Sequence, residues 1–431
     1  MNLILAIPIE VRIAGLFVLG GLLGGMANWA VYRLAWNRRS ISPWSPPGPK
    51  APRRSPFDRV PIFGWLTLQR EASLHGRGFW IRPMLVELAA AFGLAWLYHF
   101  EVTCAGLIVA DIPRPVPADW QGMLHAWFVA HALLIWLMLV ASLIDLDEKT
   151  IPDAITVWGT LVGLLIAGFF PLAALPDWIR FDVAPNFWRI LSDQPELWQR
   201  MTFNAPGAAP DWPDGFPALW PLVVAMGCWG LWCFGLLRRD WYTRHGLGRA
   251  VQLCLARLRR DPSTARIGLL TVVGAVAIGG FRVAGGPGWI SLLSALIGMA
   301  VAGGLIWVIR ILGSFVLRRE AMGFGDVTLM SMIGVYVGWQ ASILIFFFAP
   351  LAAVAVGLVV LVLQRNNVIP YGPFLCLATL AVLLGWADLW NHVSPYFAQR
   401  WLVPGALACC LFLLPVLLAI WLAIKRLIFR F

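Results

Sequence analysis

The sequence is poor in charged residues, and acids are the scarcer kind. Of its 431 residues only 13% are charged whereas 60% are hydrophobic, and 33 Lys and Arg outnumber 22 Asp and Glu. Ordinary soluble domains carry about 25% charged residues. The composition therefore argues against a soluble domain, and it makes each acid beside a long apolar stretch informative.

The sequence also lacks patterns that would point to other classes of protein. None of its seven cysteines forms a Cys-x-x-Cys pair, so zinc is not indicated. We expect the thiols to pack as small hydrophobic side chains. No alternating segments of about ten residues indicate a transmembrane β-barrel. We find no internal repeat and no low-complexity tract.

What the sequence does contain is a series of long apolar runs. Several approach or exceed the roughly 20 residues that a helix needs to cross a bilayer, and lipid cannot satisfy open strand edges. We predict an all-α fold: a polytopic transmembrane helix bundle of about 11 apolar segments, with a cytoplasmic loop domain after the first helix. Small residues at 20–25 and 298–304 favour close helix packing. The segments are 13–36, 84–110, 122–144, 154–175, 216–237, 267–283, 290–316, 327–337, 340–363, 370–388 and 404–424.

The basic residues are unevenly divided among the loops. Loop 37–83 has nine Lys or Arg against two acids, and loop 238–266 has eight Arg, whereas loop 176–215 has three Arg and six acids. Threading the segments in order puts the basic loops on one side and the acidic loop on the other. By the positive-inside rule the C-terminus, Asp145 and Asp326 then lie on the cytoplasmic side. The charge indicates a lipid bilayer as partner, and no nucleic acid.

Two aspartates stand at the ends of apolar segments that otherwise exclude acids. Asp145 lies in the run 143–153 (LIDLDEKTIPD) and Asp326 in the run 323–329 (GFGDVTL). A carboxylate near hydrocarbon is costly to keep and indicates a function. Two carboxyls within hydrogen-bonding range hold a single proton near neutral pH. The charged one can then take a proton from water while the neutral one donates to a scissile carbonyl or leaving amine.

Neighbouring residues suggest how these acids are presented, but spacing alone leaves other interpretations open. Gly323 and Gly325 would let a substrate backbone approach Asp326. Pro152 would end helical continuation after Asp145 and fix a turn at the membrane surface. A single Asp at a helix end is more often an interfacial residue or a cap than a catalyst. Further acids at 147, 148 and 153 leave the choice within the first cluster open.

Both runs are similar to the paired motifs of bacterial type IV prepilin peptidases, which are GxGD-type intramembrane aspartyl proteases. In that family Ile-Asp-Leu is followed by Pro-Asp, and a later Gly-x-Gly-Asp follows Glu-Gly-Met and precedes Lys-Leu. This chain has Ile-Asp-Leu at 144–146, Pro-Asp at 152–153 and EAMGFGDVTL at 320–329. The resemblance continues at 28–34, 77–88, 333–339 and 369–374.

The resemblance implies an aspartic endopeptidase with Asp145 and Asp326 as its catalytic pair. It implies a substrate with a basic leader, a Gly at the cut and a hydrophobic helix after it, as in type IV prepilins and type II secretion pseudopilins. The leader stays on the cytoplasmic side of a bacterial inner membrane, where the charge pattern places both acids. Roles in shaping the site or binding substrate fall to Gly323, Gly325, Pro152 and Asp153.

One departure from the family concerns zinc. Many members have two Cys-x-x-Cys pairs in the first loop, and this loop has no cysteine. A tetrahedral thiolate site therefore cannot form, and zinc is not expected. The equivalent positions are near Ser42, Ser45, Ala72 and His75. The loop would have to fold without metal, by packing Trp65, Phe79 and Trp80.

Two further departures concern a cation and a cofactor. The family's Lys two residues after the second aspartate is Thr328 here. Loss of this cation would either shift the pH optimum upward or leave its role to Arg318 or Arg319. Many members also methylate the new N-terminus of the pilin with S-adenosylmethionine. No Gly-rich fingerprint for that cofactor stands out in this chain, so we expect no cofactor for proteolysis and leave the methyltransferase activity open.

The resemblance also divides the chain. We expect an N-terminal transmembrane helix at 1–36, a loop domain without zinc cysteines at 37–83, and helices with the first catalytic Asp at 84–175. An insertion at 176–288 would contain an extracytoplasmic loop, two extra transmembrane segments and a basic loop whose 245–262 stretch favours a surface helix. Helices with the second motif would follow at 289–431. The insertion could bind a pilus or secretion assembly protein or simply enlarge the bundle.

Two other functions compete with proteolysis. A catalytically inactive pilus or secretion assembly protein could have kept the fold, although the two retained acids argue against it. A proton-coupled transporter would also keep acids within the membrane. Transporters usually place them near the bilayer midplane on related halves, whereas these two lie near one surface and no repeat relates them.

Overall fold

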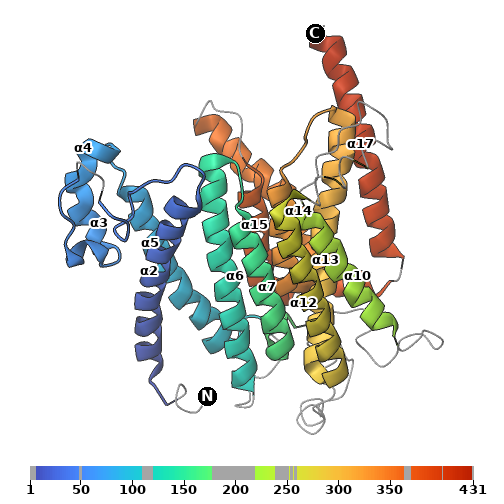
Figure 1. Ribbon diagram of the computed structural model, residues 1–431, viewed down its shortest axis with the longest axis horizontal. Coiled ribbons are helices and arrows are strands. Elements are labelled where there is room, and N and C mark those ends of the chain that lie inside the picture. The colour runs from blue at the N-terminus through green and yellow to red at the C-terminus, as the bar shows by residue number, and fades with distance from the viewer. Residues whose placement is uncertain are drawn as a thin grey trace.

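The computed structural model shows a bundle of long helices with a small subdomain at one corner (Figure 1). It describes residues 6–47, 51–108, 120–176, 219–237, 260–363, 370–399 and 401–429, together with positions 252 and 256. No strand occurs in these parts of the chain. Within the described residues seven helices are long and apolar enough to cross a membrane, or eight if a bent pair is counted as one span. The prediction of an all-α, multi-pass membrane bundle is confirmed.

Each predicted apolar segment coincides with a helix or part of one. Two of these helices, α7 and α10, are shorter than a full span. The helices are α2 (Ile9–Leu34), α5 (Ile81–Tyr98), α6 (Gln121–Glu148), α7 (Asp153–Phe169), α10 (Trp220–Leu236), α12 (Pro262–Ala284), α13 (Gly286–Leu317), α14 (Phe324–Leu363), α15 (Gly372–Leu384), α16 (Trp386–Ala398) and α17 (Leu402–Phe429).

Two breaks in the helices differ from the predicted segments in an instructive way. The segments 327–337 and 340–363 form one helix, α14, which is kinked where Gly338 leaves helical geometry with φ 79°. Glycine adopts this left-handed conformation without steric strain. The short segment 327–337 therefore ends next to a residue at which the helix can change direction. At the other break, α15 ends before Gly385 and α16 leaves it at 91°, so the segment predicted at 370–388 is bent rather than straight.

Glycines let two helix pairs approach until their backbones touch. A Cβ on Gly334 of α14 would lie 2.3 Å from the carbonyl oxygen of Gly298 on α13. On the other side of the bundle, a Cβ on Gly20 of α2 would lie 2.5 Å from the carbonyl oxygen of Ala90 on α5. The close packing expected of both small-residue runs is confirmed. The first contact holds α13 against the half of α14 that begins with Asp326.

We expect Gly334→Ala to separate α13 from α14, because its methyl group cannot fit beside the Gly298 carbonyl. Overpacking of this kind lowers the free energy of unfolding by about 1–3 kcal/mol. The thermal midpoint of the detergent-solubilised protein measures it. Gly304→Ala is the matched control, since nothing lies within 4 Å of that position. Equal midpoints for the two variants would contradict the close crossing.

The subdomain between α2 and α5 contains the short helices α3 (Phe63–Thr67) and α4 (Ala72–His75), at the upper left of Figure 1. It is fastened to the bundle through Glu87, a buried acid of α5. The Glu87 carboxylate accepts hydrogen bonds from the Ile62 backbone N–H at 2.6 Å, from Trp65 Nε1 at 2.8 Å and from Asn28 Nδ2 at 3.2 Å. Three donors satisfy a charge that burial alone would penalise. Trp65 is fully buried as expected.

The other two aromatic residues expected to hold this loop contribute less. Phe79 and Trp80 are only half-buried. The ring of Phe79 lies against His75, with the ring centroids 5.1 Å apart. Aromatic packing alone therefore does not hold the subdomain together, and polar contacts contribute as well.

Asp58 is one of these polar centres. Its buried carboxylate accepts hydrogen bonds from Thr67 Oγ1 and the Ser55 backbone N–H, both at 2.6 Å, and pairs with Arg70. Burial by itself would raise the pKa of Asp58, but the bonds from Arg70, Thr67 and Ser55 outweigh it and lower the pKa to about 2.

We expect acid to weaken this subdomain. Because the pKa of folded Asp58 is about 2 and its ordinary value is 3.8, its contribution to stability is complete above about pH 4 and is lost as the pH falls towards 2. Wild type and Asp58→Asn should therefore differ in thermal midpoint at about pH 5 and converge near pH 2. A difference that stays constant across that range would show that the Asp58 charge is not the cause.

Two expectations fall outside the part of the chain that the structure describes. They are the acidic loop at 176–215, of which only residue 176 is described, and most of the surface helix expected at 245–262.

Candidate functional site

Asp145 lies in the last turn of α6, with only 4% of the residue exposed. The helix ends three residues later because Lys149 adopts a left-handed conformation, φ 56°, and donates its N–H to the Asp145 carbonyl oxygen at 2.8 Å. Pro152 was expected to end this helix. Instead it caps the start of α7, and the turn it fixes belongs to the following helix.

The structure distinguishes Asp145 from the two acids that follow it. Asp147 pairs with Arg82, at the end of the subdomain. Glu148 accepts hydrogen bonds from the backbone N–H groups of Trp36 and Asn37, where the subdomain begins. Both acids therefore fasten the subdomain to the end of α6. Two of these three acids thus have structural contacts at the surface, whereas Asp145 is buried.

Asp145 is held by a residue that the sequence analysis did not assign to the site. The backbone N–H of Gly372, at the start of α15, donates to Asp145 Oδ2 at 3.2 Å. A Cβ at Gly372 would lie 2.5 Å from that oxygen, so only glycine permits the contact. The run 369–374 was noted only for its resemblance to the peptidases. The only sequence feature that marks Gly372 is the proline that follows it at the start of a helix. That pair of residues does not by itself indicate a partner for a carboxylate.

Asp326 lies in the first turn of α14, 8% exposed, after a loop that Arg310 of α13 holds in place. Arg310 Nε donates to the carbonyl oxygen of Met322 at 3.0 Å and Nη2 to Glu320 at 3.2 Å. Its guanidinium also lies 5.6 Å from the ring centre of Phe324, inside the Gly-Phe-Gly-Asp run. Arg310 could have been recognised from the sequence, because it is a cation near the end of an otherwise apolar helix. It was not among the predicted site residues.

The ends of α6, α14 and α15 bring the two aspartates into one buried region. Asp326 lies close enough for the charge of Asp145 to act on it. Cys376 lies one turn along α15 from Gly372, close enough to interact electrostatically with both Asp145 and Asp326. Tyr371 is close enough to interact with Asp326. Residues far apart in sequence thus form one cluster, in which two carboxyls face a small set of groups from α15.

The two glycines of the second motif serve different purposes. A Cβ on Gly325 would lie 2.9 Å from Cβ of Ile151, in the turn between α6 and α7. Gly325 therefore allows the two aspartate-bearing segments to pack together, and the expected approach of substrate is not its main reason. A Cβ on Gly323 would meet nothing nearer than Asp326 Oδ2 at 3.9 Å. Space beside the acid remains at Gly323.

Comparison with known proteins finds a family that matches both aspartate-bearing regions. Residues 132–184 and 264–358 match the type IV leader peptidase family. The first matched segment contains Asp145 and the second contains Asp326. In these two segments the chain resembles the type IV leader peptidase family. The runs at 28–34, 77–88 and 369–374 lie outside the family match, and the unmatched stretch between its two parts is narrower than the insertion expected at 176–288.

Individual relatives match over a limited region. Proteins named prepilin leader peptidase/N-methyltransferase are 35% identical over 101 residues in Stutzerimonas stutzeri and 37% identical over 112 residues in Pseudomonas aeruginosa. A third, from Aeromonas hydrophila, is 33% identical over 105 residues. The alignments cover 23–25% of this chain and 35–38% of the relatives, so the chain spans about a third of the length of the curated relatives it matches. No solved structure matches the chain.

The matched segments differ from the expected motif at Thr328. Its buried hydroxyl donates to the carbonyl oxygen of Gly325 and accepts a hydrogen bond from Thr156 of α7, each at 3.1 Å. A neutral side chain there joins α7 to α14. Arg318 and Arg319, expected to supply the missing cation, are exposed at the end of α13. Arg310 is the basic residue that contacts the motif.

Asp153 occupies the first turn of α7, and its side chain is exposed. An acid in a first helical turn interacts favourably with the helix dipole. It lies in the turn that follows Asp145 and was expected to shape the site. The structure places it at the helix surface, and its role in shaping the site stays a prediction.

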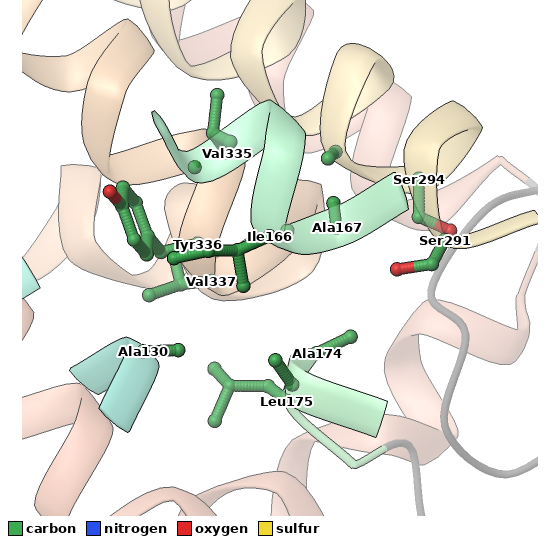
Figure 2. A pocket seen from close by; sticks show the side chains of 14 residues that line it. Ala130, Ile166, Ala167, Ala174, Leu175, Ser291, Ser294, Val335, Tyr336 and Val337 are labelled. Carbon is green, nitrogen blue, oxygen red and sulfur yellow. The ribbon is translucent and has the colours of Figure 1, made fainter. Parts of the chain in front are cut away.

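A separate cavity of about 30 Å³ lies where α6, α7, α13 and α14 meet (Figure 2). Ser291 and Ser294 of α13 border it, and their hydroxyl oxygens have no hydrogen-bond partner in the protein. The cavity also touches residues 335–338, about three helical turns along α14 from Asp326. It has room and polar partners for water, and it is not part of the aspartate cluster.

The described residues offer no group of three or more His, Cys, Asp or Glu side chains able to hold a metal ion. The six cysteines among them are free of disulfides.

We expect Gly372→Ala to displace the Asp145 carboxylate, since the new methyl group and Oδ2 cannot occupy positions 2.5 Å apart. Any activity that depends on Asp145 should fall by about a hundredfold, the scale of a misplaced catalytic group. Gly93→Ala is the control, because nothing lies within 4 Å of that glycine. Unchanged activity in Gly372→Ala would mean that its contact with Asp145 does not matter.

Proposed function

We propose that this protein is a membrane-embedded aspartyl endopeptidase that removes the basic leader from type IV prepilins or type II secretion pseudopilins. One observation carries the proposal. Two acids from distant helices, Asp145 and Asp326, are buried together where three helix ends meet, and each lies in a segment that matches the leader peptidase family.

In the proposed reaction the two carboxyls share a proton and activate one water molecule between them. The charged carboxylate takes a proton from that water as it attacks the scissile carbonyl. The protonated carboxyl donates its proton to the carbonyl oxygen. When the tetrahedral intermediate collapses, the proton taken from water passes to the leaving amine, and the carboxyl that gave up its proton takes one back from a hydroxyl of the intermediate. Each acid returns to its starting state, so the step needs no cofactor and no covalent intermediate.

Access by a substrate backbone is supported by the geometry at the second motif. Gly323 leaves open space beside Asp326, whereas Gly325 is occupied by packing on Ile151. A peptide with a Gly at the cut could lie along this gap with little steric hindrance. Half-buried Tyr371 borders the same region on the α15 side.

We assign the site to the cytoplasmic face of a bacterial inner membrane. The basic loop 37–83 is attached to the same end of α6 that carries Asp145, through Glu148 and Asp147. Basic loops stay on the cytoplasmic side by the positive-inside rule. In Figure 1 the end of α17 lies at the same end as this subdomain, and the start of α2 lies at the opposite end.

The alternatives receive less support from the same observations. A transporter would place its acids near the bilayer midplane, whereas Asp145 and Asp326 lie in the last and first turns of their helices. An inactive assembly protein would not need the contact between the Gly372 amide and the Asp145 carboxylate. The name of the relatives includes N-methyltransferase, but that activity is theirs, and the proposal covers proteolysis alone.

The test is cleavage of candidate prepilins and pseudopilins in membranes that contain wild type, Asp145→Asn or Asp326→Asn. Asparagine keeps the shape and removes acid–base function, so each variant should lose at least about a hundredfold in rate. Asp147→Asn, two residues from Asp145, is the matched control and should retain cleavage within about tenfold, because its Arg82 contact lies at the surface.

Insertion of every variant is checked by its level in washed membranes. If both variants cleave as fast as wild type, the two-aspartate mechanism is wrong. If wild type itself cuts no cognate prepilin or pseudopilin, the inactive assembly protein becomes the better reading.

A further inference from the structure

The subdomain between α2 and α5 is built around a buried arginine. Arg54 has a side chain only 4% exposed, and it faces Glu71, whose side chain is completely buried. Arg54 Nε donates to Glu71 Oε1 at 2.9 Å and Nη2 to Oε2 at 2.7 Å. This two-point geometry is the strongest form of a guanidinium–carboxylate contact. His75 Nε2 lies 3.3 Å from the same Glu71 carboxylate.

The remaining donors of Arg54 bind the chain segment that follows α2. Nη1 donates to the carbonyl oxygens of Ser42 at 2.6 Å and Ser45 at 3.0 Å, and Nη2 donates to that of Ser40 at 3.0 Å. A guanidinium has five N–H groups, and each therefore has an acceptor. Ser42 and Ser45 themselves form a tight turn, with the Ser45 N–H 2.9 Å from the Ser42 oxygen.

The segments that meet at Arg54 are those where many prepilin peptidases would carry zinc cysteines. The equivalent positions are near Ser42 and Ser45 on one side and Ala72 and His75 on the other. The structure brings the turn 42–45 and the segment 71–75 to opposite sides of one guanidinium. A zinc ion does not fit here, since thiolates are missing and a permanent cation occupies the space between the segments.

We propose that Arg54 replaces a structural metal: its guanidinium joins the turn 42–45 to Glu71, so the subdomain folds without zinc. The substitution is chemically reasonable. Zinc would join four thiolates by coordination, whereas Arg54 joins one carboxylate and three carbonyl oxygens by hydrogen bonds. Both arrangements place a cation between the same two chain segments. The proposal does not depend on the protein's being a protease.

The first test removes the cation. Arg54→Met leaves the Glu71 carboxylate buried and uncompensated, a change that is strongly destabilising. Chymotrypsin should then cut within 37–83 about a hundredfold faster than in wild type, as expected when the open form is that much more populated. Arg53→Met is the matched control, because Arg53 is adjacent in sequence and its side chain is exposed. Cleavage of this variant should stay at the wild-type rate.

Two further variants keep the test decisive if Arg54→Met accumulates poorly. Arg54→Met combined with Glu71→Leu removes both charges and should be cut more slowly than Arg54→Met alone, because no buried charge is left unpaired. Arg54→Lys keeps the charge but cannot make the two-point contact, and its cleavage rate should lie between those of wild type and Arg54→Met. If Arg54→Met and Arg53→Met are cut equally slowly, the proposal is wrong.

The second test uses zinc itself. Purified wild type should contain much less than one zinc per chain, and a chelator should leave its cleavage by chymotrypsin unchanged. In the Arg54→Met background, four cysteines introduced together by Ser42→Cys, Ser45→Cys, Ala72→Cys and His75→Cys should bind about one zinc and restore resistance to chymotrypsin. Stoichiometric zinc in wild type, or failure of the four cysteines to bind zinc, would show that Arg54 does not occupy a metal's place.

Discussion

An acid can be kept inside an apolar bundle only where a donor meets it, and this constraint determines how the helices are joined. Glu87 draws the Ile62 amide and Trp65 onto α5, and Glu101 pairs with His131 of α6 at 2.8 Å. Asp145 requires the Gly372 amide, so α15 must begin beside the end of α6. Each of these acids joins chain segments that sequence order does not place together. The aspartate cluster differs from the other sites, because two acids are buried in the same region there instead of one acid with its donors.

Much of this arrangement follows from the sequence by simple physical arguments. Apolar runs predicted the helices, and the gap between the segments 327–337 and 340–363 falls at Gly338, where α14 is kinked. Rarity of acids in apolar runs pointed to the two segments that contain Asp145 and Asp326. The bend at Gly385 was not predicted, because a glycine between two apolar stretches does not show whether the chain turns there.

Some contacts could not be predicted from the sequence, because the groups that make them have no distinctive side chain and lie in no local pattern. Gly372 acts through its backbone amide, which every residue but proline has, and only the missing Cβ marks it. Arg54 resembles the other arginines of a basic loop until its burial against Glu71 is known. Spacing could not separate Asp145 from Asp147 and Glu148, since those acids differ only in partners that come from the distant subdomain. Gly325 was expected to admit substrate, yet its main contact is with Ile151.

The guanidinium at the centre of the subdomain also bears on the conditions under which the protein can be made. A thiolate cluster is lost when oxidants attack its sulfurs, and it cannot assemble in a cell starved of zinc. Arg54 and Glu71 contain no sulfur, and arginine keeps its charge throughout the physiological range. A subdomain held in this way can mature during oxidative stress or metal limitation, when a relative with four cysteines would have to wait for reductant and metal.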